Sequence, residues 1–202
     1  GSYTIVANAF IFSLIPTAII IMFARMKSSS PTVMIMAGIA VMYIFNALTT
    51  VMMLIADPND LEAVYEWQVG SLGSLSWDGM PIMVGITIIG IVVTQFLSKK
   101  LNVLAAGDDM ANSLGVNANN LRTIIMIVVA LMTAGIVSFT GLIGFVGLVV
   151  PHVVRLFVGA DNRYLILASA TFGAALLVVA DLVGRTIIAP ATLQVGVITA
   201  FL

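Results

Sequence analysis

Apolar runs long enough to cross a lipid bilayer are the feature that most limits what this chain can fold into. A transmembrane helix needs about 20 mostly apolar residues at a rise of about 1.5 Å each, and such runs recur along the 202-residue sequence. Hydrophobic residues make up 61% of the chain and charged residues 8%, against roughly a quarter charged in soluble domains. Too few charges remain to build a water-facing surface. The sequence therefore predicts an all-α, polytopic transmembrane helical bundle.

We predict about seven spans within a single transmembrane domain that covers residues 1–202. The run over 123–158 is far too long for one crossing, so it must turn once, and Phe139-Thr140-Gly141 is the expected turn. The seventh span begins near Leu193 and is incomplete. The other six are predicted at 3–23, 32–56, 81–97, 123–139, 142–158 and 164–188.

The sparse basic residues predict the orientation of these spans. With the boundaries above, seven of the eight lie on one side of the membrane: Arg25, Lys27, Lys99, Lys100, Arg122, Arg155 and Arg163. Basic loops are retained in the cytoplasm, so this side is predicted to be cytoplasmic, with 98–122 as its long loop. The opposite loop, 57–79, carries five acidic residues and is predicted to be external. Arg185 is the one basic residue on that side.

The motifs for energised chemistry are missing from the sequence. It has no P-loop, no G-x-G-x-x-G, no pair of carboxylates within a span and no cysteine, and His152 is its single histidine. We expect no cofactor, no metal site and no catalysis, so any energy must enter through a partner. The net charge of −1 argues against nucleic acid as a partner. An intramembrane enzyme lacks its catalytic groups here, whereas an ion-gradient-driven secondary transporter stays open, because Pro151 and the glycines could break helices.

The loop 98–122 is the polar stretch with the most local structure. Asp108 and Asp109 can stabilise the start of a short helix, Gly115 permits a left-handed stop, and Asn117 can cap a second helix before Arg122. The loop is either a solvated connection or a docking element for another protein.

Other singled-out residues also allow two interpretations. Arg185 can pair with Asp181 four residues earlier and end its helix, or it can meet a partner. Ser30 before Pro31 is a good helix start. The Pro151-His152 pair indicates a bent helix end anchored at the interface. Six glycines predict close helix packing: Gly38, Gly85, Gly90, Gly135, Gly173 and Gly196.

Several motifs in series carry a family resemblance. DDMANSLGV (108–116) with Leu121-Arg122 is followed by GLIGFVGLVVPHVVR (141–155), ADLVGRT (180–186) and VGVITA (195–200), and WQVGSLGSLSW (67–77) precedes them. In this order they resemble the permease subunits of binding-protein-dependent ABC importers, in the branch that takes up iron–siderophores, haem and vitamin B12. The resemblance covers essentially the whole chain. Gln194 departs from it, since the family usually has proline there.

The resemblance implies a multi-pass subunit of the plasma or inner membrane. Chains of the family usually have ten spans, so this one is expected to lack the first three and most of the tenth. Two copies, most simply a homodimer, would form the pathway for an iron–siderophore, haem, cobalamin or similar metal chelate. An ATP-binding cassette ATPase would drive transport, and an external substrate-binding protein would deliver the cargo.

The resemblance also implies roles for individual residues. The loop 98–122 would be the coupling segment that seats on the ATPase, through Ala111, Leu114, Gly115, Val116 and Arg122. Arg185 would meet an acidic residue of the binding protein. Ser30 and Thr32 would lie at the cytoplasmic gate, although a helix cap is the simpler interpretation of Ser30.

Overall fold

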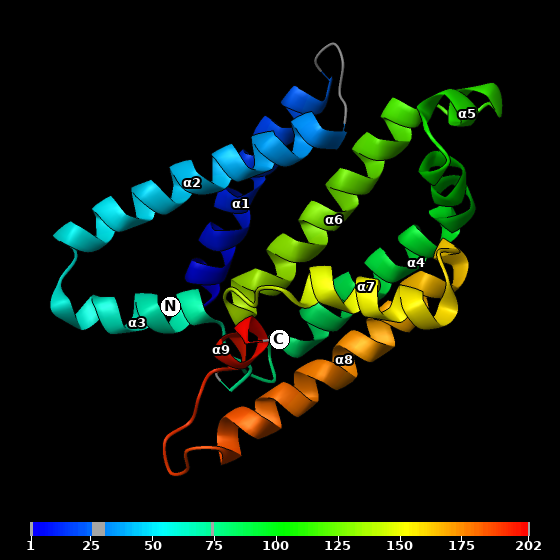
Figure 1. Ribbon diagram of the computed structural model, residues 1–202. Helices are drawn as coiled ribbons and strands as arrows, with labels where there is room; N and C mark the ends of the chain where they lie inside the picture. Colours follow the sequence, from blue (N-terminus) through cyan, green and yellow to red (C-terminus); the bar gives the residue numbers. More distant parts are fainter. Residues whose placement is uncertain (1, 26–30, 74, 202) are drawn as a thin grey trace.

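The computed structural model describes residues 2–25, 31–73 and 75–201, and the regular structure in these ranges is helical (Figure 1). The prediction of an all-α bundle is therefore confirmed. The helices in the described part are α1 (Ser2–Arg25), α2 (Pro31–Ile55), α3 (Pro58–Val69), α4 (Met80–Ala105), α5 (Asp108–Ser113), α6 (Ala118–Thr140), α7 (Val146–Val158), α8 (Asn162–Thr186) and α9 (Val195–Ala200).

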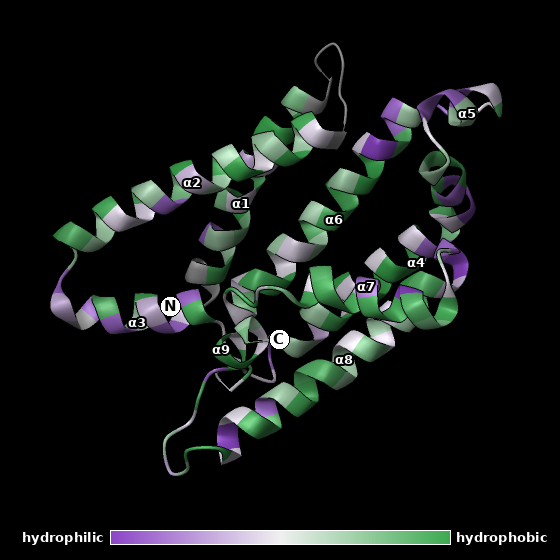
Figure 2. Cartoon of the chain, viewed as in Figure 1, coloured by the Kyte–Doolittle hydropathy of each residue, from purple (hydrophilic) through white to green (hydrophobic). Residues whose placement is uncertain are grey.

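Five of the helices in the described ranges are long and apolar enough to cross a membrane, namely α1, α2, α4, α6 and α8. They match five of the predicted spans, and α2 begins at Pro31 as expected. Helices α4 and α6 continue beyond the predicted span ends into the loop 98–122. Figure 2 shows that polar residues gather there and along α3, while the middles of the long helices are apolar.

The span predicted at 142–158 differs from a continuous helix. Helix α7 begins at Val146 and has 13 residues, too few to cross alone. The chain from Gly141 to Phe145 is not helical, and both of these residues have positive φ (69° and 64°). Gly141 ends α6 at the predicted turn, and Phe145 directly precedes α7. The helix then runs on through Pro151 and ends before Gly159.

The loop 57–79 contains a helix that the sequence analysis did not predict. Helix α3 begins with Pro58 at its first position and carries Asp60 in its first turn. Both are ordinary helix-start signals. These signals do not predict a membrane span, because the segment is too polar to cross the bilayer.

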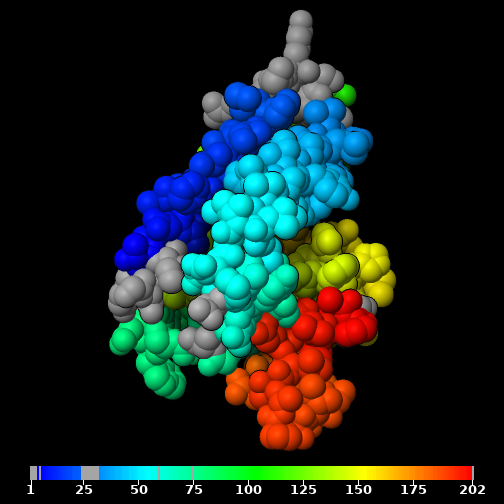
Figure 3. All heavy atoms as spheres, turned by 90° about the vertical axis from the view of Figure 1, so that its left-hand side faces the viewer, coloured from blue at the N-terminus to red at the C-terminus, as the bar shows by residue number. Residues whose placement is uncertain are grey.

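The bundle has two ends that lie far apart (Figure 1). We call one the α5 end: it holds α5, the end of α4, the start of α6 and the turn from α7 to α8. The other is the α3 end, with α3, α9 and the loop after α8. Helix α1 packs on α6 and α2 packs on α1, and Figure 3 shows α1 and α2 side by side.

Three segments at the ends of α3, α6 and α9 meet at the α3 end and exchange backbone hydrogen bonds. The amide of Ser71 donates to the carbonyl of Thr140 (2.8 Å), that of Leu142 to Trp67 (3.1 Å) and that of Gly196 to Gly70 (3.3 Å). We call segments 67–71, 140–142 and 194–196 the glycine junction. Its hydrogen bonds satisfy backbone groups that have no helical partner.

The junction depends on backbones that approach without side chains between them. A Cβ placed on Gly196 would overlap the carbonyl oxygen of Val69, and one on Gly141 would overlap that of Trp67. The predicted close packing is confirmed at Gly196, at Gly90, where a Cβ would overlap Met132, and at Gly135, where it would overlap Ile86. Gly173 makes an ordinary contact, since its Cβ would lie 3.6 Å from Val150. The prediction is wrong at Gly38 and Gly85, which have no neighbouring atom within 4 Å of an added Cβ.

We predict that Gly196→Ala destabilises the protein, because the new methyl group must push two backbone segments apart. Overpacking of this kind costs about 1–3 kcal/mol, so the melting temperature in detergent should fall by about 5 °C. Gly38→Ala is the matched control, since its methyl enters open space in the interior of α2 and should leave the melting temperature unchanged or slightly raised. Equal melting temperatures for the two variants would show that the junction tolerates expansion.

Candidate coupling and docking sites

The loop between α4 and α6 folds into a compact turn around α5. At its end the amide of Val116 donates to the carbonyl of Ala111 (2.8 Å) and that of Gly115 to Asn112 (3.0 Å). This pair of bonds is the Schellman motif, which needs a left-handed residue after the helix. Gly115 supplies it with φ of 77°, as predicted. We call residues 108–116 the coupling knob.

Side chains fasten the coupling knob to the start of α6. Arg122 donates two hydrogen bonds to Asp108, from Nη2 to Oδ1 (2.7 Å) and from Nη1 to Oδ2 (3.2 Å). The amide of Ala118 donates to Asn112 Oδ1 (3.3 Å). Asn117 caps α6 by accepting from the amide of Asn120 (3.0 Å), so the predicted second helix is simply the beginning of α6.

The knob presents an apolar tip away from the bundle. Leu114 is 62% exposed and Met110 is 53% exposed. Met110 is in α5 and Leu114 directly follows it, in a segment rich in polar residues (Figure 2). No other part of the described chain buries these two side chains. The tip is therefore accessible to another protein.

The predicted coupling residues divide into two groups. Leu114 and Gly115 lie at the exposed tip, where another protein can touch them. Ala111 is fully buried, Val116 is partly buried, and the Arg122 side chain is 15% exposed in its ion pair with Asp108. The second group shapes the knob and holds it in place, and does not form its outer surface.

Arg185 lies at the opposite end, in the last turn of α8. Its Nε donates to Asp181 Oδ2 (2.7 Å), the pairing predicted from the sequence, and its side chain is still 52% exposed. The guanidinium lies beside the loop after α3, since a Cβ on Gly73 would be 3.6 Å from Nη2. Figure 3 shows the end of α8 and the following loop projecting from the molecule. Arg185 is thus paired and accessible at once.

The remaining predicted residues are not joined to either site. Thr32 is exposed in the first turn of α2, and Ser30 lies outside the described residues. His152 is exposed on α7. Among the described residues there is no group of three or more His, Cys, Asp or Glu that could hold a metal ion.

Sequence analysis missed a polar network at the α5 end. Asn102 on α4 donates from Nδ2 to Asp161 Oδ1 (2.7 Å), and its Oδ1 accepts from the amide (2.8 Å) and Nδ2 (2.9 Å) of Asn162. Asp161 caps α8, and its pKa lies well below the usual value because it accepts hydrogen bonds from the Arg163 side chain and amide and from Asn102. The cap could have been found from the sequence. Its partner, 59 residues away, could not.

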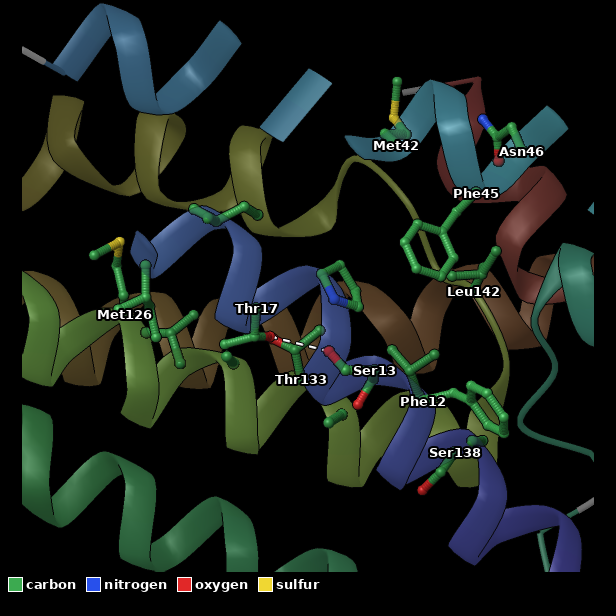
Figure 4. A pocket seen from close by; sticks show the side chains of 18 of the residues that line it. Phe12, Ser13, Thr17, Met42, Phe45, Asn46, Met126, Thr133, Ser138 and Leu142 are labelled. Atoms are coloured by element: carbon green, nitrogen blue, oxygen red, sulfur yellow. Dashed lines mark hydrogen bonds between the residues drawn. The ribbon is translucent and has the colours of Figure 1, made fainter. Parts of the chain in front are cut away.

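A cavity of about 1030 Å³ lies between α1, α2 and α6. In Figure 4, Phe45 of α2 reaches toward Leu142 at one end. Two hydroxyls of its wall bond within their own helices: Thr17 donates to the carbonyl of Ser13 (3.0 Å) and Thr49 to that of Phe45 (2.9 Å). Most lining residues are apolar, and Asn46 and Thr133 add polar groups.

Comparison with known proteins shows the family of the chain. The sequence matches the model of the FecCD transport family over residues 1–202. It is 42% identical over 200 residues to an ABC transporter permease protein of Methanocaldococcus jannaschii, covering 99% of this chain and 57% of that protein. It is 34% identical over 200 residues to the hemin transport system permease protein HmuU of Yersinia pestis, covering 99% and 60%. The chain thus spans somewhat more than half the length of these relatives.

A solved structure of similar fold belongs to a metal-chelate type ABC transporter in an inward-facing conformation. It aligns with a TM-score of 0.93 at 25% identity and covers 100% of this chain and 65% of that one. The protein is a multi-pass membrane protein of the ABC permease class. It belongs to the FecCD transport family.

We predict that the Arg122–Asp108 pair contributes modestly to holding the coupling knob on α6. Arg122→Met and Asp108→Asn should each lower the melting temperature by about 2–4 °C, because a partly exposed ion pair contributes about 1 kcal/mol or less. The melting temperature of the double variant should be no lower than that of the less stable single variant, since the same interaction is lost in all three. Fully additive losses would mean that the two side chains act separately.

Proposed function

We propose that this chain is the membrane-spanning subunit of an ABC importer for a metal chelate of the iron–siderophore, haem or cobalamin kind. Two copies would form the pathway, ATP hydrolysis in a partner subunit would drive it, and an external binding protein would deliver the cargo. This chain would carry out no covalent chemistry and would need no cofactor. The observation that carries the proposal is the coupling knob with its exposed Leu114, in a chain whose family is one of transport permeases.

The charges support an orientation with the α5 end in the cytoplasm of a cell whose plasma or inner membrane holds the protein. Lys99, Lys100, Arg122 and Arg163 belong to the helix ends that meet there, as the order of the helices requires. The α3 end carries Arg185 and the acidic residues of the loop 57–79. Positive loops stay on the cytoplasmic side, so the knob would face the ATPase and Arg185 the binding protein.

Transport would proceed by movement of helices as rigid bodies. ATP-driven rearrangement of the partner would push or pull the coupling knob, which is continuous with the ends of α4 and α6. An ion-gradient mechanism is less well supported, because it calls for buried carboxylates within spans. In the described spans the one acidic residue is Asp181, and it is already paired with Arg185.

We predict that Leu114→Asp uncouples transport from ATP hydrolysis. A carboxylate at the tip cannot enter an apolar groove without losing its hydration, and a lost anchor of about 1.4 kcal/mol already weakens seating tenfold. Cargo uptake into vesicles that hold the reconstituted transporter should fall by about tenfold or more. Leu114→Met is the control, because it keeps size and polarity and should retain uptake. Normal uptake in Leu114→Asp would contradict the coupling role.

We predict that Arg185→Glu weakens docking of the binding protein, because it replaces the accessible cation with an anion beside Asp181. The affinity of the binding protein for the transporter, measured with the membrane protein in nanodiscs, should fall by about tenfold or more at low salt and by less at high salt. Asp181→Asn is the informative control: it frees Arg185 from its pair, so affinity should be kept or raised. Unchanged affinity in Arg185→Glu would remove the docking assignment.

A further inference from the structure

The side-chain hydrogen bonds with the largest sequence separation in the described chain join α4 to α8 at the α5 end. We call this group the amide clasp: Asn102 and Gln95 on α4, with Asp161, Asn162 and Arg163 at the start of α8. Besides the three hydrogen bonds of Asn102, Gln95 Nε2 donates to the carbonyl of Arg163 (2.8 Å). Each of these bonds connects residues 59 to 68 positions apart. Most other side-chain bonds in the described chain stay within one helix or turn.

The chemistry of the clasp requires an amide at position 102. Asp161 can only accept hydrogen bonds while ionised, so it needs the Nδ2 donor of Asn102. The amide and Nδ2 of Asn162 are donors, so they need the Oδ1 acceptor. An aspartate at 102 would set two carboxylates against each other, and a leucine would leave donors and an acceptor unpaired. The Nε of Arg163, bonded to both Asp161 oxygens (3.1 and 2.9 Å), fixes the carboxylate in place.

The clasp lies where motion of the coupling knob would enter the bundle. Only Ala106 and Gly107 separate the end of α4 from α5, and their amides still bond back to the carbonyls of Val103 and Leu104 (3.1 Å each). Asn102 is three residues before the end of α4. Any displacement of the knob therefore acts on the helix end that the clasp ties to α8.

Helix α8 connects this point to the opposite end of the molecule. It has 25 residues, a length of about 37 Å, and it runs from the clasp to Asp181 and Arg185. It packs against α4 and α7 on the way. A rigid helix is one of the elements that can carry energetic coupling between two distant sites, and α8 joins the clasp to the helix end that holds Arg185.

We infer that Asn102 and Asp161 are positioning residues that make α4 and α8 move together, so that docking at Arg185 is sensed at the coupling knob. The inference rests on the proposed function and goes beyond it. Neither residue touches the ATPase, the cargo or the binding protein in this assignment. We expect them to affect how strongly binding at one end changes the other end. The affinities for the ATPase and for the binding protein should not depend on them.

The test compares ATP hydrolysis by the reconstituted transporter with and without its binding protein. In Asn102→Asp the carboxylates repel, so stimulation by the binding protein should fall by at least about threefold, within the range of ordinary coupling energies. Basal hydrolysis, co-purification of the ATPase and affinity for the binding protein should stay as in the wild type. Asn120→Asp, the same change at an exposed asparagine of the α5 end, is the matched control and should keep full stimulation.

A charge swap separates positioning from damage to the fold. In Asn102→Asp combined with Asp161→Asn, the new amide at 161 can donate to the new carboxylate at 102, which still accepts from Asn162. The amide nitrogen cannot accept the bonds that Asp161 Oδ1 receives from the Arg163 amide and Nε, so stimulation should recover in part in the double variant. Wild-type stimulation in Asn102→Asp, or a loss that the swap does not repair while the protein stays folded, would overturn the inference. A wild-type protein that binds no ATPase would instead overturn the proposed function.

Discussion

A backbone amide in a bilayer has no water to bond with, and this need for internal partners governs the whole molecule. The long helices meet it along their own length. Where the chain leaves helical geometry, at 67–71, 140–142 and 194–196, the partners come from other loops, and the glycines let those loops approach closely enough. The shortened α7 is tolerated for this reason. Residues at the start of its crossing bond to the junction in place of a helical turn.

The same constraint explains how much the sequence could foretell. Five spans follow from run length alone, and the turn at Gly141 follows from a run too long for one crossing. The local devices around Gly115 and Asn117 were also readable, because a left-handed stop and a side-chain cap involve neighbours in sequence. The non-helical stretch before α7 could not be predicted in this way, since the amide of Leu142 bonds to Trp67, more than 70 residues earlier.

The candidate sites show a similar division. Asp181 and Arg185 are four residues apart on one helix, so the sequence predicts their ion pair and the structure contains it. The burial of Ala111 and the engagement of Arg122 with Asp108 depend on how the knob folds back on α6. The sequence analysis predicted that all of these residues belong to one loop. It could not distinguish the residues at the exposed tip from those that hold the knob in place. The amide clasp went unseen, because nothing near Asn102 in the sequence signals a partner at Asp161.

The Schellman closure of α5 has a thermodynamic consequence for association. The bonds from Val116 to Ala111 and from Gly115 to Asn112 are made within the knob itself, so its backbone is already ordered before anything touches it. A partner that binds at Leu114 would not have to order the backbone of this loop, so little conformational entropy would be lost on binding. A preorganised element of this kind would move as a rigid unit, so a displacement at Leu114 would reach the helix ends that flank the knob.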